Sequence, residues 1–278
     1  MRAGILLTGL LACALPTVAM DGEQLRQLVR KTLDLRLENE KKLLDYGFLR
    51  RTHKKQRSAA GEVKSEERFT ARVERREGLR VSYIVERNDE PVPADEMAQS
   101  HARIREIAAE RRAETPEQRR KRESAERKEP GERDYLQEFP NAAEFKLVGT
   151  EKVAGRDTLV VDFEPRPGYK PKDMKARIFE KVRGRIWIDK AESQFLKMDA
   201  EVFDTVSIGF GVLAKIEKGT QFHLRQMRLT DGTWAPSHQL MSFNARVMLV
   251  KSMRNEVETT FSDFRRLDAA APVVASAQ

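Results

Sequence analysis

RGRIWID at residues 183–189 begins the stretch that decides the fold, and DGTWAPS at residues 231–237, followed by QLMSFNAR at 239–246, closes it. Apolar and polar residues alternate here with a period of two, and short turn signals such as Asp231-Gly232 separate the runs. The pattern predicts consecutive antiparallel strands with one tryptophan near each end. No set of residues within the stretch is typical of a catalytic site.

The same alternation continues on both sides of this stretch. Residues 69–73 and 79–86 alternate clearly, and residues 145–164 predict a hairpin. Further strands are expected at residues 48–56, 183–189, 195–202, 214–217, 220–230, 239–250 and 256–267. A sheet of about ten strands must curl, split or close.

Two helices are predicted beside the strands. Asp21 is a good N-cap and Gln24 completes a capping box for an amphipathic helix over residues 22–44. Its apolar positions are Leu25, Leu28, Val29, Leu33 and Leu37. A short helix is expected at residues 174–182, after Asp173. The predicted fold is α+β: a curled antiparallel sheet forming an open half β-barrel of about ten strands, with the long N-terminal helix on its concave face and the short helix covering it.

The first residues predict export. Arg2 provides a basic start, residues 3–15 are apolar, and the small residues before a cleavage site after Ala19 complete a signal peptide over residues 1–19. The expected location is the periplasm. Cys13, the only cysteine, leaves an alternative, in which it is lipidated and anchors the chain. The domain organisation expected is a single domain over residues 20–267 and a disordered tail at 268–278.

Charge is unusually abundant, at 35% of the 278 residues, with a net charge of +8. Such a charge favours anionic partners, and export excludes nucleic acid among them, which leaves an anionic membrane surface as one partner. Much of the charge lies in residues 91–133, which predict a charged helical insertion broken at Thr115-Pro116 and Pro130-Gly131. This insertion is either a contact for an anionic surface or a solvated excursion whose interleaved charges cancel.

Motifs for known chemistry are lacking. The sequence contains no nucleophile elbow, zinc-protease motif, Walker loop or dinucleotide fingerprint, and its four histidines have no ligand spacing. His223, on a predicted strand, is interpreted as a hydrogen-bonded structural residue. Asp162 and Glu164 share one face of a strand, which is typical of a solvated face rather than a glycosidase pair. We therefore expect no enzyme, no cofactor and no metal.

Aromatic residues are the candidates for a ligand cavity. The stretch at residues 206–213 is either a hydrophobic loop at a cavity mouth or a core strand with a glycine bulge. Trp187 and Trp234 either line the cavity or belong to the core. The predicted cavity residues are Trp187, Phe195, Phe210, Phe222, Trp234 and Phe243.

GRIWID at residues 184–189, the return strand FLKMDAE at 195–201, and DGTWAP at 231–236 together resemble the outer-membrane lipoprotein-sorting proteins. These belong to the wider group of the periplasmic lipoprotein carrier and its outer-membrane receptor. The resemblance spans most of the chain after residue 19. It implies an open, half-closed antiparallel barrel with helices over its mouth, and a cavity for acyl chains. The chain is longer than the carrier, partly through residues 91–133, and no contact residue of the family can be carried over.

Two functions follow from these observations. The first is an exported, non-catalytic protein that binds lipid or a lipoprotein acyl chain, with a role in outer-membrane lipoprotein sorting. The alternative is an envelope sensor or scaffold that binds protein partners through the same fold. The sequence predicts neither the ligand nor the oligomeric state.

Overall fold

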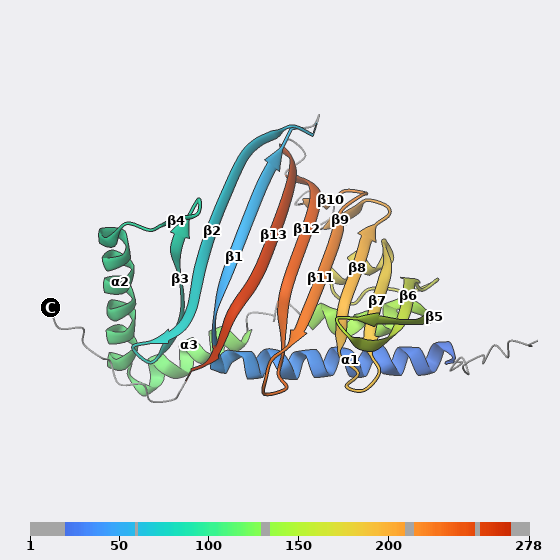
Figure 1. Ribbon diagram of the computed structural model, residues 1–278, viewed down its shortest axis with the longest axis horizontal. Coiled ribbons are helices and arrows are strands. Elements are labelled where there is room, and N and C mark those ends of the chain that lie inside the picture. Colours follow the sequence, from blue (N-terminus) through green and yellow to red (C-terminus); the bar gives the residue numbers. More distant parts are fainter. Residues whose placement is uncertain (1–19, 59–60, 129–133, 209–213, 248–250, 268–278) are drawn as a thin grey trace, which may run out of the picture.

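The structure is a computed structural model that describes residues 20–58, 61–128, 134–208, 214–247 and 251–267 (Figure 1). The predicted signal peptide with Cys13 and the predicted tail at 268–278 lie outside these residues. Within the described ranges, no helix combines the length and the apolar character needed to cross a membrane.

Most of the described chain forms strands. They are β1 (Tyr46–Arg57), β2 (Val63–Arg76), β3 (Leu79–Arg87), β4 (Glu90–Pro91), β5 (Ala143–Val153), β6 (Arg156–Pro165), β7 (Val182–Asp189), β8 (Phe195–Val202), β9 (Val206–Ile208), β10 (Ala214–Ile216), β11 (Gln221–Arg228), β12 (Trp234–Val247) and β13 (Lys251–Arg266). The helices are α1 (Gly22–Lys42), α2 (Ala94–Ala113), α3 (Pro116–Lys128) and α4 (Phe139–Ala142), with 3₁₀ turns η1 (Leu43–Asp45), η2 (Asp134–Glu138) and η3 (Lys175–Glu180).

All these strands belong to one antiparallel sheet. In the described residues the order is β4-β3-β2-β1-β13-β12-β11-β8-β7-β6-β5, and β10 joins β12 to β9 at one side. The two outermost strands do not pair with each other, so the sheet is open and curled (Figure 1). The predicted fold class is confirmed. The first and last long strands are neighbours: Tyr46 pairs with Arg266, and after a register shift between Gly47 and Leu49 the β1–β13 ladder runs on to Arg57.

Helix α1 crosses one face of the sheet near the ends of the strands (Figure 1). The predicted capping box is present: Asp21 accepts a hydrogen bond from the Gln24 backbone N–H at 2.8 Å, and the Gln24 side chain accepts one from the Asp21 N–H at 3.0 Å. The buried positions are Leu25, Val29, Thr32 and Asn39. The buried face therefore turns polar halfway along the helix, away from the leucine stripe that the sequence indicates.

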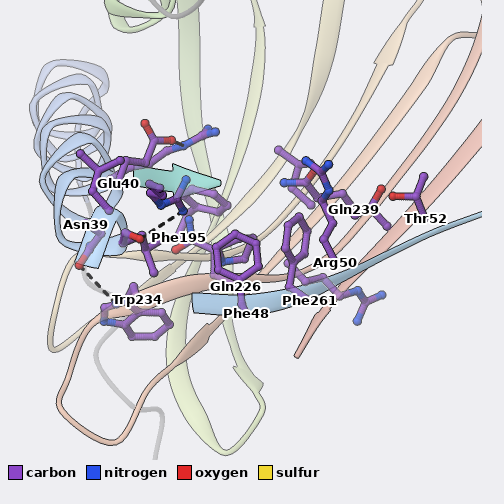
Figure 2. Close-up of a pocket in the computed structure, with 18 of the residues that line it drawn as sticks. Asn39, Glu40, Phe48, Arg50, Thr52, Phe195, Gln226, Trp234, Gln239 and Phe261 are labelled. Atoms are coloured by element: carbon purple, nitrogen blue, oxygen red, sulfur yellow. Dashed lines mark hydrogen bonds and ion pairs between the residues drawn. The ribbon is translucent and has the colours of Figure 1, made fainter. Parts of the chain in front are cut away.

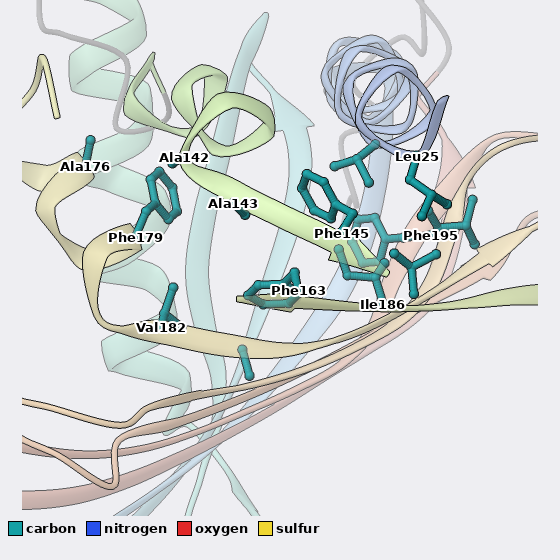
Figure 3. Packing of buried hydrophobic residues seen from close by; sticks show 14 residues of the cluster. Leu25, Ala142, Ala143, Phe145, Phe163, Ala176, Phe179, Val182, Ile186 and Phe195 are labelled. Atoms are coloured by element: carbon teal, nitrogen blue, oxygen red, sulfur yellow. The ribbon is translucent and has the colours of Figure 1, made fainter. Parts of the chain in front are cut away.

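The hydrophobic core lies under the first half of α1. Leu25 and Val29 pack with Phe145, Val161, Phe163, Ile186 and Ile188 from β5, β6 and β7, and with Phe179 from η3 (Figure 3). Phe139 joins this cluster with its ring 5.1 Å from Phe163 and 5.3 Å from Phe179. The helices α1 and α4 and the turn η3 thus cover one end of the sheet together.

The predicted charged insertion contains two helices. Helix α2 packs along β3 through Ile104 and Ala108, and the His101 ring meets the Tyr83 ring edge-on at 5.3 Å. Pro116 begins α3, which carries Arg and Glu on most positions. Both helices lie at the β3 end of the sheet, away from the core under α1 (Figure 1).

Several boundaries differ from the sequence prediction. The covering helix is a 3₁₀ turn, η3, and β12 begins at Trp234, five residues before the predicted strand. Its ladder with β11 has an irregularity beside Gln226, opposite Pro236, which allows a proline within the strand. Residues 206–208 form β9 in the sheet, while residues 209–213 lie outside the described part of the chain.

Gly184 of β7 lies close against the backbone of β8. A Cβ atom there would overlap the Asp199 carbonyl oxygen and lie 2.8 Å from the Ala200 Cα. We expect Gly184→Ala to lower the free energy of unfolding by about 1–3 kcal/mol, because backbone atoms must move to admit the methyl group. Urea denaturation measures this change.

The matched control is Gly149→Ala in β5, where nothing lies within 4 Å of an added Cβ. It should leave the stability unchanged or raise it by about 0.5–1 kcal/mol. Equal effects of the two substitutions would contradict the close packing at Gly184.

Candidate functional site

The second half of α1 roofs a cavity instead of a packed core. The cavity has a volume of about 480 Å³, within the range of about 300–1,000 Å³ that is usual for small-molecule pockets. It lies between this half of the helix and the strands β1, β11, β12 and β13 (Figure 2). Its lining comprises Arg36, Asn39, Glu40, Leu43, Leu44, Phe48, Arg50, Thr52, Phe69, Arg80, Phe195, Leu224, Arg225, Gln226, Trp234, Pro236, Gln239, Thr259 and Phe261.

Aromatic rings form much of the cavity floor. Phe48 of β1 and Phe261 of β13 lie side by side, with ring centroids 5.9 Å apart (Figure 2). Strand alternation places Phe48, Arg50 and Thr52 on the same face of β1, and their ladder partners extend this face across the sheet. The floor is therefore built by pairing the two ends of the described chain.

The helix supplies a more polar wall. Arg36 pairs with Glu40 at 3.2 Å and lies over the Phe195 ring at 5.5 Å. The Asn39 side chain accepts a hydrogen bond from the Trp234 backbone N–H at 3.3 Å. Leu44, just beyond the helix, is 55% exposed and so places an apolar side chain at the mouth.

The Trp234 side chain is held by a network of charges. Its indole N–H donates to Glu192 at 2.8 Å, and Glu192 also accepts hydrogen bonds from Arg156 and Arg228. Burial opposes ionisation of Glu192, but these three donors outweigh it and lower the pKa. Arg156 also binds Asp189 at 2.6 Å and lies over the Trp234 ring. This network fixes the wall at the start of β12.

Asp189 is the most buried carboxylate of that network, with a side chain 2% exposed. Burial raises its pKa, but the Arg156 guanidinium and the backbone N–H groups of Glu192 and Ala191 prevail, so the pKa lies below its ordinary value. The same carboxylate caps the turn between β7 and β8. The turn and the cavity wall therefore depend on one ionised group.

Cations outnumber anions around the cavity. Four arginines line it, and Glu40 is the single carboxylate in the described lining. Burial lowers the pKa of Arg80, whose guanidinium lies over Phe48 and donates to the Leu43 carbonyl oxygen at 3.4 Å. An arginine remains charged even so. The cavity thus combines an apolar floor with a surplus of positive charge.

The six predicted cavity residues have different surroundings. Phe195 and Trp234 line the cavity. Phe222 packs against the neighbouring core cluster, and Phe243 is half-buried further along β12, on the face that Gln239 shares. Phe210 lies outside the described residues.

Trp187 lies on the opposite face of the sheet. Its indole N–H donates to Glu151 at 2.7 Å, and the Lys197 ammonium lies 3.9 Å from its ring centre. Trp187 is buried by these charged neighbours and is not in the cavity lining. Alternation within β7 separates Trp187 from Ile186 and Ile188, but it does not identify the face that α1 covers.

Sequence reasoning missed the residues from β1 and β13. Residues 48–56 read as a basic strand, and Phe48 and Arg50 alternate there with Leu49 and Arg51, so both faces look alike. The ladder with β13 supplies the missing information, because it sets Phe261 beside Arg50. No local signal reveals that pairing.

Other groups considered in the sequence have structural partners. Asp162 accepts two hydrogen bonds from Arg185, at 2.5 and 2.9 Å, and His223 shares a hydrogen bond of 2.8 Å with Asp199. Across the described residues, no group of three or more His, Cys, Asp or Glu side chains is placed to hold a metal ion.

Comparisons with known proteins gave structural likenesses alone. No family model and no curated protein matches the chain. A domain described as an outer membrane lipoprotein-sorting protein from Vibrio parahaemolyticus matches with 13% identity, 87% of this chain and 94% of that chain covered, and a TM-score of 0.35. A LolA superfamily protein from Nitrosomonas europaea matches with 10% identity, 87% and 94% coverage and a TM-score of 0.29. A DUF1329 family protein from Desulfovibrio piger matches with 11% identity, 87% and 95% coverage and a TM-score of 0.28.

The descriptions of the first two structures agree with the family that the sequence resembles. At these identities and TM-scores, the likenesses identify neither a function nor a site residue of this chain.

The lowered pKa values of Asp189 and Glu192 predict acid sensitivity. Their stabilising effect is complete above the ordinary values of 3.8 and 4.5 and is lost as the pH falls through the lower folded-state values. We expect the unfolding free energy to be steady from pH 7 to about pH 5 and to decline below. Asp189→Asn should cost about 1–3 kcal/mol at pH 7 and flatten the decline, as measured by urea denaturation at each pH.

Glu144→Gln removes an exposed carboxylate from β5 and provides the control. It should leave both the stability and the acid decline as in the wild type. An undiminished decline in Asp189→Asn would exclude Asp189 as its source.

Proposed function

We propose that the protein is an exported, non-catalytic binding protein that holds a lipid or lipoprotein acyl chain in the cavity beneath α1. The observation that carries this proposal is the cavity of about 480 Å³ floored by Phe48, Phe261 and Leu224. The sequence adds a predicted signal peptide and the resemblance to lipoprotein-sorting proteins. The periplasm is the compartment that these features favour.

Burial of an acyl chain is the proposed mechanism. Each methylene removed from water contributes about 0.8 kcal/mol, so about ten methylenes provide about 8 kcal/mol before the cost of association. The rings of the floor suit a chain because they present apolar surface without competing hydrogen-bond donors. Leu44 at the mouth extends this surface toward solvent.

Blocking the cavity tests the proposal. Gln239→Trp adds a large side chain on the face of β12 that lines the cavity. We expect it to weaken binding of the uncharged dye N-phenyl-1-naphthylamine at least about tenfold, because the added indole occupies the volume of the ligand. Fluorescence titration measures the dissociation constant, and urea denaturation checks that the variant is folded.

Leu240→Trp is the matched control, because the next residue of the same strand points to the opposite face. Its affinity for the dye should equal that of the wild type. Native mass spectrometry of gently purified protein should also detect bound lipid. Absence of co-purified lipid, together with no displacement of the dye by lipids, would refute the proposal.

Removal of the charged insertion distinguishes lipid binding in the cavity from the function of an envelope scaffold. In the described lining of the cavity no residue comes from α2 or α3. Replacing residues 92–133 with a short Gly-Ser linker should therefore leave dye affinity within about twofold of the wild type. Loss of dye binding in a folded deletion variant would show that the insertion belongs to the site.

A further inference from the structure

Arg50 differs from the other cations of strand β1. Its Nε atom is buried and has no hydrogen-bond partner among the described residues. Its ladder neighbours are Phe261 on β13 and Ala71 on β2, neither of which offers an acceptor side chain. A buried nitrogen without an acceptor is costly, because it has lost its hydration without gaining a hydrogen bond in exchange.

On the outer face of β1, which is the face turned away from the cavity, basic side chains are paired with carboxylates. Arg51 pairs with Asp89, His53 Nε2 lies 2.6 Å from Glu66, and Lys55 lies 3.4 Å from Glu256. On that face, each of these basic side chains has a carboxylate beside it. Arg50, one residue away on the cavity face, is left without one in the described structure.

The remaining cations of the cavity are engaged or solvated. Arg36 is paired with Glu40, and Arg80 donates to the Leu43 carbonyl oxygen. Arg225 is an exposed residue of β11. Arg50 is therefore the lining cation that combines a buried nitrogen with the lack of any hydrogen-bond or ion-pair partner among the described residues.

A second polar atom of the cavity is also unsatisfied. The Oε1 atom of Gln226 is buried without a partner among the described residues. This oxygen is an acceptor, so it needs a hydrogen-bond donor such as a hydroxyl group or a water molecule, which a hydrocarbon chain does not offer. A purely apolar occupant would leave it unsatisfied.

We propose that Arg50 binds the anionic head group of an amphiphile whose hydrocarbon chain occupies the cavity, which makes the ligand a carboxylate or phosphate amphiphile. This inference rests on the proposed lipid-binding function and specifies its ligand. The planar guanidinium matches the two oxygens of a carboxylate or phosphate. The aromatic floor beside it receives the chain.

Displacement of N-phenyl-1-naphthylamine tests the proposal with competitors that have the same hydrocarbon chain and different head groups. Dodecanoate and dodecyl phosphate are compared with the uncharged methyl dodecanoate, all below their micelle-forming concentrations, and with inorganic phosphate alone. In the wild type, the two anionic competitors should bind at least about tenfold more tightly than the ester, as expected for a charge-assisted hydrogen bond. Inorganic phosphate should not displace the dye.

Arg50→Gln should abolish this preference while leaving affinity for the ester and the dye within about twofold. Arg50→Lys should retain part of it, because the charge remains but the two-pronged geometry is lost. Arg51→Gln, one residue away on the outer face, is the matched control and should behave as the wild type. A stronger preference for dodecanoate or for dodecyl phosphate distinguishes a fatty acid from a phospholipid as the source of the head group.

Several results would overturn the proposal. Equal affinity of the wild type for anionic and uncharged competitors would exclude a head-group site while leaving the acyl-chain function intact. An unchanged preference in Arg50→Gln would exclude Arg50 as the anchor. Displacement by inorganic phosphate would indicate a phosphate site that needs no chain, and failure of the wild type to bind the dye would refute the lipid-binding function itself.

Discussion

The attachment of helix α1 to the sheet determines the rest of the structure. Besides the apolar packing of Leu25 and Val29, two buried polar side chains contribute to this attachment: Thr32 donates to the Ser193 carbonyl oxygen at 2.8 Å, and Asn39 accepts from the Trp234 N–H at 3.3 Å. Both bonds join the helix to backbone at the edges of strands, one at the β7–β8 turn and one at the start of β12. Buried hydrogen bonds of this kind are costly to leave unmade. These two bonds hold the helix at a fixed distance from the sheet, although the space beneath its second half is a cavity rather than a packed apolar core.

The two faces of the sheet differ in how their basic residues are paired with carboxylates. On the outer face, Arg51, His53 and Lys55 of β1 are paired, and Arg185 is bound by Asp162 on β6. Such exposed pairs contribute little to stability individually. They do neutralise one another, whereas Arg50, on the cavity face of the same strand, has no such partner among the described residues. Net charge alone would have suggested a basic surface instead.

Local patterns in the sequence were sufficient for the elements but not for the site. The capping box at Asp21 and the alternation in residues 183–202 predict α1, β7 and β8 closely, because these signals depend on neighbouring residues only. The cavity depends on the pairing of β1 with β13, which lie some 200 residues apart in the sequence. Phe195 and Trp234 were predicted because they are aromatic residues of the recognisable stretch. Arg50 was not, since an arginine in a basic strand has no feature that distinguishes an inward from an outward position.

The polar second half of α1 explains why the cavity exists at all. Leu25 and Val29 fill the space above β6 and β7, whereas Arg36, Asn39 and Glu40, further along the helix, line the cavity. Apolar side chains at those positions would bring dispersion contacts and exclude water, so the present sequence forgoes stability that an ordinary core would supply. The rings of Phe48 and Phe261 line the space that remains between the helix and the sheet. A cavity whose side chains are not packed for maximum stability is typical of a binding function, because a ligand can supply the missing packing contacts. The aromatic floor and the unpartnered Nε of Arg50 are the two features on which the proposal of a ligand with both a chain and an anionic head rests.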